Sequence, residues 1–484
     1  MVAPRDHGII GLPEKSVRRV PLRPVLSRSC ADFSALVVEA RDRLANAASG
    51  TRLVSITAPA KDADPLGFFS GSQEAPRSFW ERPFEGMVVA GSGVAWEAGD
   101  GPASEVNHRL RLLAEDAVIL APEGAPTQPI LTAAFPFSPG ALESPIWRGF
   151  AGPSIILPEV VVGRRNGDTW LTINRMVESV DDMDAIIGLA ESASASAIPF
   201  TPPMTGQESR SVNRRSVPEF PEWSEAIDLA LTTFRRGSLV KVVLARRQDI
   251  ELSEMPDRSL IIERLRDAYP EGAVFAIARG EQIFLGATPE GLAEVYGGTI
   301  RVGCLAGSIS RGRDEQEDRD QTERLLADDK NRREHDAVVQ FVAECVQPIT
   351  DSLDIAASPS ILTVRNVHHL ETSVVGRIAK GVTVLDAVAA LHPTPAMAGA
   401  PVAAALDFIG KHESIERGLY ASPVGWLNLA AEGDFAVAIR SALLSGNTAH
   451  LFAGCGIVQG SEPLAEWQET KVKLQPMLSA LGIN

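Results

Sequence analysis

The sequence predicts an α+β protein in which large mixed or antiparallel sheets carry helices packed on their outside. Strand-like and helix-like segments interleave along the C-terminal half of the chain. Two strand-like runs, 274–278 and 282–286, lie only a few residues apart, which is typical of an antiparallel hairpin and not of parallel strands joined by a crossover. The 484 residues, 45% of them apolar, are enough to bury a large core without disulfides.

The two halves of the chain differ in their patterning. The N-terminal half predicts a β-rich scaffold, because short apolar runs alternate there with Gly- and Pro-rich stretches. Residues 192–223 mix Ser, Pro and charge without periodicity, which predicts a linker. We therefore distinguish an N-terminal scaffold portion, 1–220, from a C-terminal portion, 221–484, and expect them to form one compact domain. The predicted strands are 117–120, 155–162, 170–173, 239–244, 274–278, 282–286, 435–439 and 448–452, and the predicted helices are 323–346, 384–391 and 463–481.

Charge and cysteine content exclude several classes of protein. The net charge is −16, the opposite of what a phosphate-binding surface needs, so we expect no nucleic-acid partner. The four cysteines lie far apart without a C-x-x-C pair, which disfavours a zinc site or a disulfide scaffold and suits the cytoplasm. Residues 1–20 lack the apolar stretch of a secretory signal, and the longest apolar tract, 385–409, is interrupted by prolines and charges. We expect a cytoplasmic protein without a membrane partner.

The last predicted helix carries two acids and a base on one stripe. Glu466, Glu469 and Lys473 are spaced i, i+3 and i+7, and Ser461 is a suitable N-cap for this helix. A solvated flank with a Glu–Lys pair explains this pattern. The spacing alone favours that interpretation over a functional one.

A second carboxylate stands in a less ordinary position. Glu334 recurs with Val338, Phe341 and Val342 at helical spacing, which predicts a carboxylate on an apolar face. An ionised carboxylate in such a place is costly unless it is paired or bound to a cation. Glu334 either lies at the edge of the core or binds a hard cation. Oxygen ligands without a His/Cys cluster would favour Mg²⁺ over zinc.

Lys241 interrupts an otherwise apolar strand. The run 239–244 is apolar on both faces, which is typical of an interior strand. A buried lysine loses its proton readily and can then act as a general base. The alternative is an ammonium group that reaches solvent at the sheet edge. The residues alone leave both interpretations open.

Nine strings of the C-terminal portion, in order, resemble the chorismate-utilising enzymes and, among these, the isochorismate synthases. Each string alone is a weak signal, and their common order makes the resemblance specific. The strings are KVVLARR (241–247), FLGATPEGL (284–292), CLAGSISRG (304–312), LLADDKNRREHDAVV (325–339), VHHLET (367–372), LHPTPAMAGAP (391–401), ERGLYASPVGW (416–426), FAVAIRSALL (435–444) and AGCGIVQGSEPLAEWQETKVK (453–473).

The resemblance implies a fold, a substrate and a metal. It implies a monomeric, two-lobed enzyme that binds chorismate and one Mg²⁺ in residues 221–484. Carried over by position, Glu334 and Glu469 are similar to the family's metal ligands, with Glu466 close by as a further or alternate ligand. The positions that resemble the family's substrate-binding residues are Arg440 as carboxylate anchor, Tyr420 in the same region, Gly454 and Gly456 where the backbone approaches a carboxylate, and Lys473, His369 and Ser308.

The implied chemistry assigns opposite protonation states to two residues. Lys241, uncharged, would take a proton from the water that attacks C2 of chorismate. Glu290, kept protonated by desolvation, would give its proton to the hydroxyl that leaves C4. The product is isochorismate, which implies an isomerase in menaquinone, siderophore or salicylate biosynthesis.

Other functions compete with this one. Ammonia-using members of the family typically have Gln where Lys241 stands, so the lysine favours water as the nucleophile. Salicylate synthases share the lysine and would also eliminate pyruvate; the LHPTPAM string (391–397) favours isochorismate synthase over them. A non-catalytic chorismate- or metal-binding protein is the alternative of another class, and it would need neither Lys241 nor Glu290. The chain departs from the family's usual residues near the expected pocket at Gly291, Cys304, His368 and Ala398.

Overall fold

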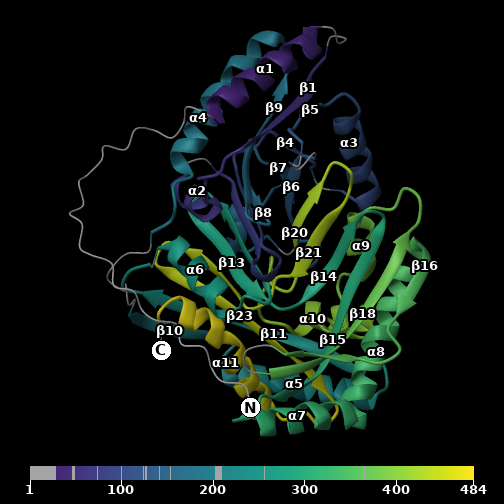
Figure 1. The fold of residues 1–484 in the computed structure, drawn as a ribbon. Helices are drawn as coiled ribbons and strands as arrows, with labels where there is room; N and C mark the ends of the chain where they lie inside the picture. The colour runs from purple at the N-terminus through teal and green to yellow at the C-terminus, as the bar shows by residue number, and fades with distance from the viewer. Residues whose placement is uncertain are drawn as a thin grey trace, which may run out of the picture.

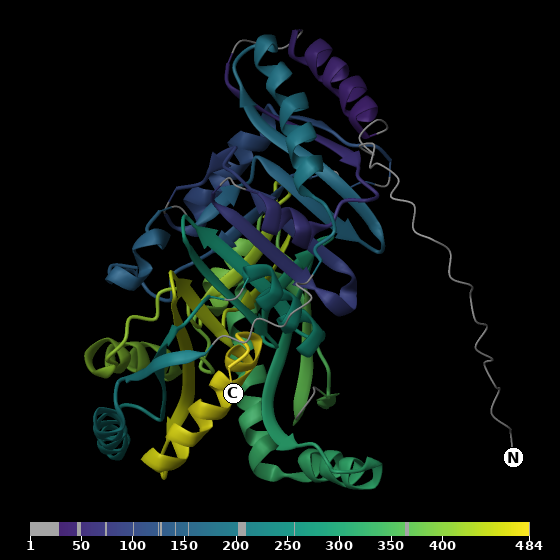
Figure 2. The same cartoon turned by 90° about the vertical axis from the view of Figure 1, so that its left-hand side faces the viewer.

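The computed structural model describes residues 29–45, 50–72, 75–99, 101–123, 125, 128–140, 142–152, 154–201, 210–255, 257–363 and 367–483. Within these residues it confirms the α+β class, with two large sheets and helices on their outer surfaces (Figures 1 and 2). Residues 1–20, for which we predict no secretory signal, lie outside the described part of the chain. No helix among the described residues is long and apolar enough to span a membrane.

The larger sheet is antiparallel except for the pair β1 and β5. It combines strands from both portions of the chain, because β12 lies beside β2. Its order is β10 (Ser211–Val217), β11 (Lys241–Leu252), β23 (Thr448–Val458), β22 (Ser441–Ser445), β13 (Gln282–Thr288), β12 (Ala273–Arg279), β2 (Arg77–Arg82), β3 (Met87–Ser92), β8 (Val160–Arg165), β9 (Asp168–Val177), β1 (Arg52–Pro59) and β5 (Val118–Leu120), with β19 (Gly399–Ala400) paired to β11.

The smaller sheet also joins the two portions, because β20 pairs with β6. Its order is β16 (Thr350–Ile355), β18 (Val367–Ile378), β15 (Thr299–Ser310), β14 (Gly291–Tyr296), β21 (Gly433–Val437), β20 (Pro423–Asn428), β6 (Ile130–Ala134), β7 (Ile155–Leu157) and β4 (Trp96–Glu97), with β17 (Ser360–Thr363) paired to β18.

The helices cover the outer faces. Helices α1, α2, α4, α6 and α11 pack on the larger sheet, and α8 and α9 pack on the smaller one. Both views place α8 and α11 at one end of the molecule, opposite α1 and α4 (Figures 1 and 2). The bounds are α1 (Ser29–Ala45), α2 (Pro65–Gly71), α3 (Ala103–Glu115), α4 (Asp184–Ser196), α5 (Phe220–Arg235), α6 (Arg258–Ala268), α7 (Glu315–Ala327), α8 (Asp329–Val346), α9 (Val384–Leu391), α10 (Val402–His412) and α11 (Pro463–Ala480).

An aromatic core holds the two sheets together. Phe275 and Phe284 of the larger sheet share one buried cluster with Phe435 of the smaller sheet. Trp147 is fully buried in this cluster, with its ring centroid 5.4 Å from that of Phe284 and 5.5 Å from that of Phe452. Burial of each such side chain is worth about 1.5–3 kcal/mol. This packing fixes the inner faces of the two sheets relative to each other. It therefore also fixes the strands that carry the candidate site.

Three predicted elements differ from the structure. The predicted helix 323–346 is two helices, because Asp328 leaves the helical conformation and its side chain accepts a hydrogen bond from the Asn331 amide. The predicted strand 155–162 is divided between β7 and β8, which belong to different sheets. The helix α11 is capped at Glu462, and Ser461 instead accepts a hydrogen bond from the Val458 amide.

The predicted linker 192–223 contains regular structure. It includes the end of α4, strand β10 and the start of α5, while residues 202–209 lie outside the described residues. Strand β10 pairs only with β11 within the described sheet and therefore forms an edge. Its side chains are largely exposed and polar, so the apolar periodicity that reveals an interior strand is missing.

Candidate active site

Lys241 lies at the start of β11, between β23 and β19. Its side chain crosses the backbone of Gly456 on the neighbouring strand. A Cβ atom on Gly456 would lie 2.8 Å from Cε of Lys241 and 3.5 Å from its Nζ. The glycine therefore leaves the space through which the half-buried lysine reaches along the inner face of the sheet.

Gly454 has the same role for another side chain. A Cβ atom on Gly454 would lie 3.2 Å from the hydroxyl oxygen of Tyr420. Tyr420 is buried, and its ring stacks on Phe452 at 5.4 Å between centroids. The absence of a side chain at Gly456 and Gly454 thus leaves room for Lys241 and Tyr420 in the protein without substrate. The predicted approach of their backbone to a substrate carboxylate stays a prediction.

Glu290 lies at the turn between β13 and β14. Its amide donates to the Thr288 hydroxyl, and its carbonyl accepts from the Val437 amide, so the turn is fixed to β21. Burial raises the pKa of Glu290 to about 7, although the nearby cations Lys473, Arg440 and Lys241 act to lower it. A carboxyl group with this pKa can donate a proton near neutral pH.

Arg440 follows β21 in a strained backbone conformation. Its φ is +51°, a backbone conformation that residues other than glycine rarely adopt. Such strained residues cluster at functional sites. Burial lowers the pKa of Arg440, while Tyr420 and Glu290 act to raise it. Among the described residues, none accepts a hydrogen bond from its guanidinium. Such a group is suited to bind a carboxylate in a bidentate manner.

Ser308 and His369 face each other across β15 and β18. The Ser308 hydroxyl and Nδ1 of His369 are 2.7 Å apart. Burial lowers the pKa of His369, and the Arg440 charge lowers it further. A neutral imidazole close to Arg440 can therefore offer a hydrogen bond to the same ligand.

Helix α11 presents its acids and its base toward β23. Lys473 binds Glu469 at 2.6 Å and donates to the Gly454 carbonyl at 3.0 Å. The pKa of Cys455 on β23 is raised, first by burial and then by the charges of Glu466 and Glu469 among others. Both acids thus lie close to the strand that carries Gly454. The predicted Glu–Lys pair is present, and it lies at the candidate site.

Glu334 lies on the predicted helix face with Val338, Phe341 and Val342, but at an exposed position, so only the burial of its carboxylate that this face implied is wrong. The carboxylate is exposed on α8, and the next residue, His335, turns into the core instead. The two ring nitrogens of His335 lie 3.2 Å from the Ala306 carbonyl oxygen and 2.7 Å from the Thr372 hydroxyl. One turn after Glu334, Val338 lines a cavity that Glu290 also lines. Glu334 is therefore at the exposed end of the helix face that leads to Glu290.

The three predicted metal ligands are not gathered into a ready metal site. In the described part of the chain, no group of three or more His, Cys, Asp or Glu side chains could hold a metal ion. Glu466 and Glu469 lie one turn apart on α11, Glu469 is paired with Lys473, and Glu334 lies on α8. Their carboxylate oxygens are the type of ligand atom that Mg²⁺ prefers. The ligand assignment stays a prediction.

A buried ion pair that the sequence analysis did not predict holds the strand that carries Lys241. Arg417 and Glu413 are 2.7 Å apart with side chains only 2% and 3% exposed. Arg417 also donates to the carbonyls of Val243 and Met397, and Glu413 accepts from the Ala245 amide. The pair thus joins β11, which carries Lys241, to the loop that follows α9. The string ERGLYASPVGW contains Arg417, but a sequence pattern does not show what a charge within it contacts.

The four unusual residues have different surroundings. Gly291 and Cys304 line the cavity beside Glu290. His368 is buried and contacts Asp318 and Thr363 through its two ring nitrogens. Ala398 is fully buried under β11, where its carbonyl accepts from the Val243 amide. Only the first two can change the shape of that cavity directly.

Comparisons with known proteins agree with this geometry. Residues 39–482 match the family described as "Chorismate binding enzyme". The chain is 33% identical to the isochorismate synthase MenF of Bacillus subtilis over 453 residues, 89% of this chain and 93% of that protein. It is 35% identical to the salicylate biosynthesis isochorismate synthase of Pseudomonas aeruginosa over 428 residues, 87% of this chain and 88% of that protein.

Solved structures give the same result. The structure of MenF, the menaquinone-specific isochorismate synthase from Escherichia coli, superposes with a TM-score of 0.76 at 28% identity and covers 93% of this chain and 99% of that one. Anthranilate synthase component I from Streptococcus pneumoniae shares the fold, with a TM-score of 0.66 at 20% identity over 81% of this chain and 92% of that one. The extent of these matches, together with the grouping of Lys241, Glu290, Arg440 and Lys473, places the chain in the family of chorismate-binding enzymes.

Proposed function

We propose that the chain is an isochorismate synthase, which converts chorismate into isochorismate by attack of water at C2 and loss of the hydroxyl group at C4. The observation that carries this proposal is the position of Glu290, whose pKa is about 7 while Lys241, Arg440 and Lys473 surround it. Relatives with this activity match almost the whole chain, which supports the same reaction here.

Each residue has a defined task in the proposed mechanism. Arg440 binds a substrate carboxylate through its guanidinium, with His369 and Ser308 nearby as hydrogen-bonding groups. Lys241 takes a proton from the attacking water, for which its amine must be uncharged. Glu290 gives its proton to the oxygen that leaves C4. Base and acid thus begin the reaction neutral and end it as an ammonium and a carboxylate close to each other, and the transfer of one proton from Lys241 to Glu290 restores both.

We further propose that Glu334, Glu469 and Glu466 hold one Mg²⁺ when the metal binds. Their oxygens are the ligand type that Mg²⁺ prefers, and Lys473 would have to release Glu469. Bound there, the ion would stabilise negative charge on the substrate carboxylate. The buried thiols of Cys304 and Cys455 support a reducing cytoplasmic location, and we propose a monomer whose product enters menaquinone or siderophore biosynthesis.

Product analysis tests the proposed function. The protein is incubated with chorismate and Mg²⁺ at neutral pH, and the products are separated by chromatography. We expect isochorismate, in an equilibrium mixture with chorismate. Salicylate and pyruvate as the main enzymatic products would instead identify a salicylate synthase. Tight chorismate binding without any product would identify a non-catalytic binding protein.

A further inference from the structure

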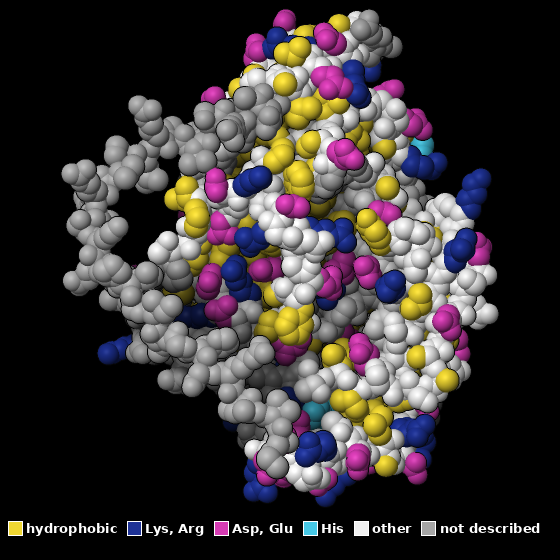
Figure 3. Space-filling view, viewed as in Figure 1, with side chains coloured by type: hydrophobic (Ala, Val, Ile, Leu, Met, Phe, Trp, Pro, Cys, Tyr) yellow, Lys and Arg dark blue, Asp and Glu magenta, His cyan; other side chains and the backbone are white. Residues whose placement is uncertain are grey.

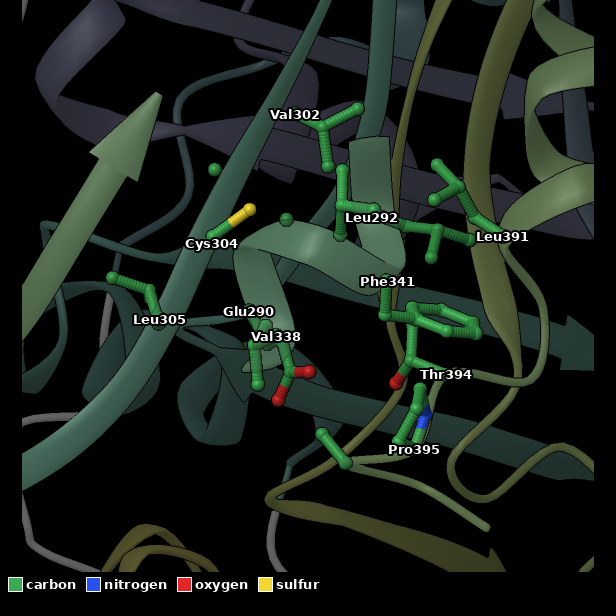
Figure 4. Close-up of a pocket in the computed structure, with 14 residues that line it drawn as sticks. Glu290, Leu292, Val302, Cys304, Leu305, Val338, Phe341, Leu391, Thr394 and Pro395 are labelled. Atoms are coloured by element: carbon green, nitrogen blue, oxygen red, sulfur yellow. The ribbon is translucent and has the colours of Figure 1, made fainter. Parts of the chain in front are cut away.

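A small chamber lies directly behind Glu290, where a hairpin opens. Strands β14 and β15 pair through Glu294–Tyr296 and Thr299–Arg301, and the pairing ends there. Beyond this point, toward Glu290, the strands separate and a cavity of about 30 Å³ lies between them. Helix α8 and the loop after α9 close it, and its wall includes Leu292, Cys304, Phe341 and Leu391 (Figure 4).

The size and lining of the chamber select its occupant. A water molecule needs roughly 10–15 Å³ of such space, whereas pockets for ligands of chorismate's size begin at about 300 Å³. The chamber therefore has room for water and not for the substrate. Most of its wall is apolar, and Figure 4 shows two polar side chains at it, the carboxyl of Glu290 and the hydroxyl of Thr394.

The Thr394 hydroxyl has an unused hydrogen-bonding capacity. Its oxygen is buried and has no hydrogen-bond partner among the described residues. A buried hydroxyl left in this state is unfavourable, because it has given up its hydrogen bonds to bulk water without replacing them. A water molecule between Thr394 and Glu290 would satisfy the hydroxyl and would lie next to the carboxyl that donates the catalytic proton.

We propose that this chamber receives the water that leaves C4 of chorismate, and that Thr394 is the positioning residue that holds it. The inference rests on the proposed function. The C4–O bond breaks as Glu290 transfers its proton to the departing oxygen, which leaves as a neutral water molecule, and Glu290 becomes a carboxylate. A second water forms the C2–O bond and gives its proton to Lys241, so one water enters and one leaves in each turnover.

Removal of this water from C4 has a kinetic consequence. A water molecule that stays at C4 can add back and regenerate chorismate, whereas one held by Thr394 is displaced from the ring. The apolar wall of Leu292, Phe341 and Leu391 offers it no other strong partner. In the reverse reaction the same water is the nucleophile, delivered from the chamber with Glu290 as its base.

Three variants test the chamber in the full-length protein with Mg²⁺ and chorismate. Thr394→Val removes the hydroxyl without changing the volume of the side chain, and Thr394→Ser retains the hydroxyl. Cys304→Leu fills the chamber with a larger side chain. Cys345→Leu is the matched control, because Cys345 lies on α8 outside the chamber. The kcat and KM for isochorismate formation are measured, and thermal melting shows that each variant is folded.

We expect Thr394→Val to lower kcat about tenfold, the effect of one lost hydrogen bond, and to leave KM within about twofold of its wild-type value. Thr394→Ser should recover most of kcat, Cys304→Leu should lower it, and Cys345→Leu should not. Wild-type kcat in Thr394→Val, or a loss that appears in KM alone, would overturn the role of the chamber. An inactive wild-type protein would overturn the proposed function instead, so the two failures are distinguishable. Should Cys304→Leu fail to fold, the Thr394 pair alone decides the outcome.

Discussion

At the scale of single residues, the pKa of Glu290 results from opposing effects. Burial disfavours the charged carboxylate, and the charges of Lys473, Arg440 and Lys241 favour it. Burial is the larger effect, and the resulting pKa of about 7 keeps a substantial fraction of the carboxyl groups protonated at neutral pH. The proton donor of the proposed reaction is therefore available without an acidic medium.

This pKa predicts the alkaline side of the pH–rate profile. The reaction needs protonated Glu290, so kcat/KM should fall as the pH rises through about 7, and below that pH Glu290 imposes no loss. A steady-state profile between pH 5.5 and 9 measures the midpoint. Glu290→Gln should lower kcat by about a hundredfold or more and remove this limb. A wild-type limb that persists in Glu290→Gln would show that another group donates the proton.

A second residue-scale prediction concerns Lys241. Lys241→Gln removes the proposed base and keeps a side chain of similar length over Gly456. Isochorismate formation should fall at least about a hundredfold, while chorismate binding in the presence of Mg²⁺ persists. Lys411→Gln, at an exposed lysine on α10, is the matched control. Retained turnover in Lys241→Gln would exclude Lys241 as the base.

At the scale of elements, the metal proposal depends on two helices. Glu469 on α11 and Glu334 on α8 each supply one of few charged ligands, so Glu469→Ala or Glu334→Ala should weaken Mg²⁺ binding about tenfold or more in titration calorimetry. Glu344→Ala, at an exposed glutamate two turns or more along α8, should bind Mg²⁺ as the wild type does. Wild-type affinity in both ligand variants would contradict the assignment.

Helix α11 also shows how far spacing alone can be interpreted. The i, i+3, i+7 pattern identifies the stripe of Glu466, Glu469 and Lys473 correctly, and the predicted Glu–Lys pair forms. A helical pattern does not show what lies opposite the stripe. Here β23 lies opposite, and Lys473 reaches its Gly454 carbonyl. The same pattern on a helix without this neighbour would be a solvated flank.

At the scale of the whole molecule, a partly buried ion pair connects the two sheets. Arg82 at the end of β2 donates two hydrogen bonds to Asp434 on β21, at 2.8 and 2.7 Å. Their side chains are 16% and 10% exposed, so water screens the pair little. The contact also joins residues 1–220 to residues 221–484. On the face shown in Figure 3, by contrast, acidic and basic side chains are interspersed over the surface.

Loss of this pair should destabilise the whole fold. Arg82→Met leaves Asp434 without its charged partner and should lower the free energy of unfolding by about 3 kcal/mol, measured by urea denaturation. Arg43→Met breaks an exposed pair with Glu39 and should change it by less than about 0.5 kcal/mol. A similar small change in Arg82→Met would show that the pair does not couple the sheets.

The sequence by itself determined the fold class and the family, and it supplied the prediction of which residues react. Strand and helix periodicity are local properties, and the predicted reacting groups Lys241 and Glu290 stand in short strings that resemble the family. Only the tertiary structure decided that Glu334 is exposed beside an inward-turned His335, that Arg417 and Glu413 support β11, and that a chamber opens behind Glu290. These features depend on which atoms meet across strands and helices distant in the chain. Burial, pairing and cavity volume are set by such contacts, and no local pattern encodes them.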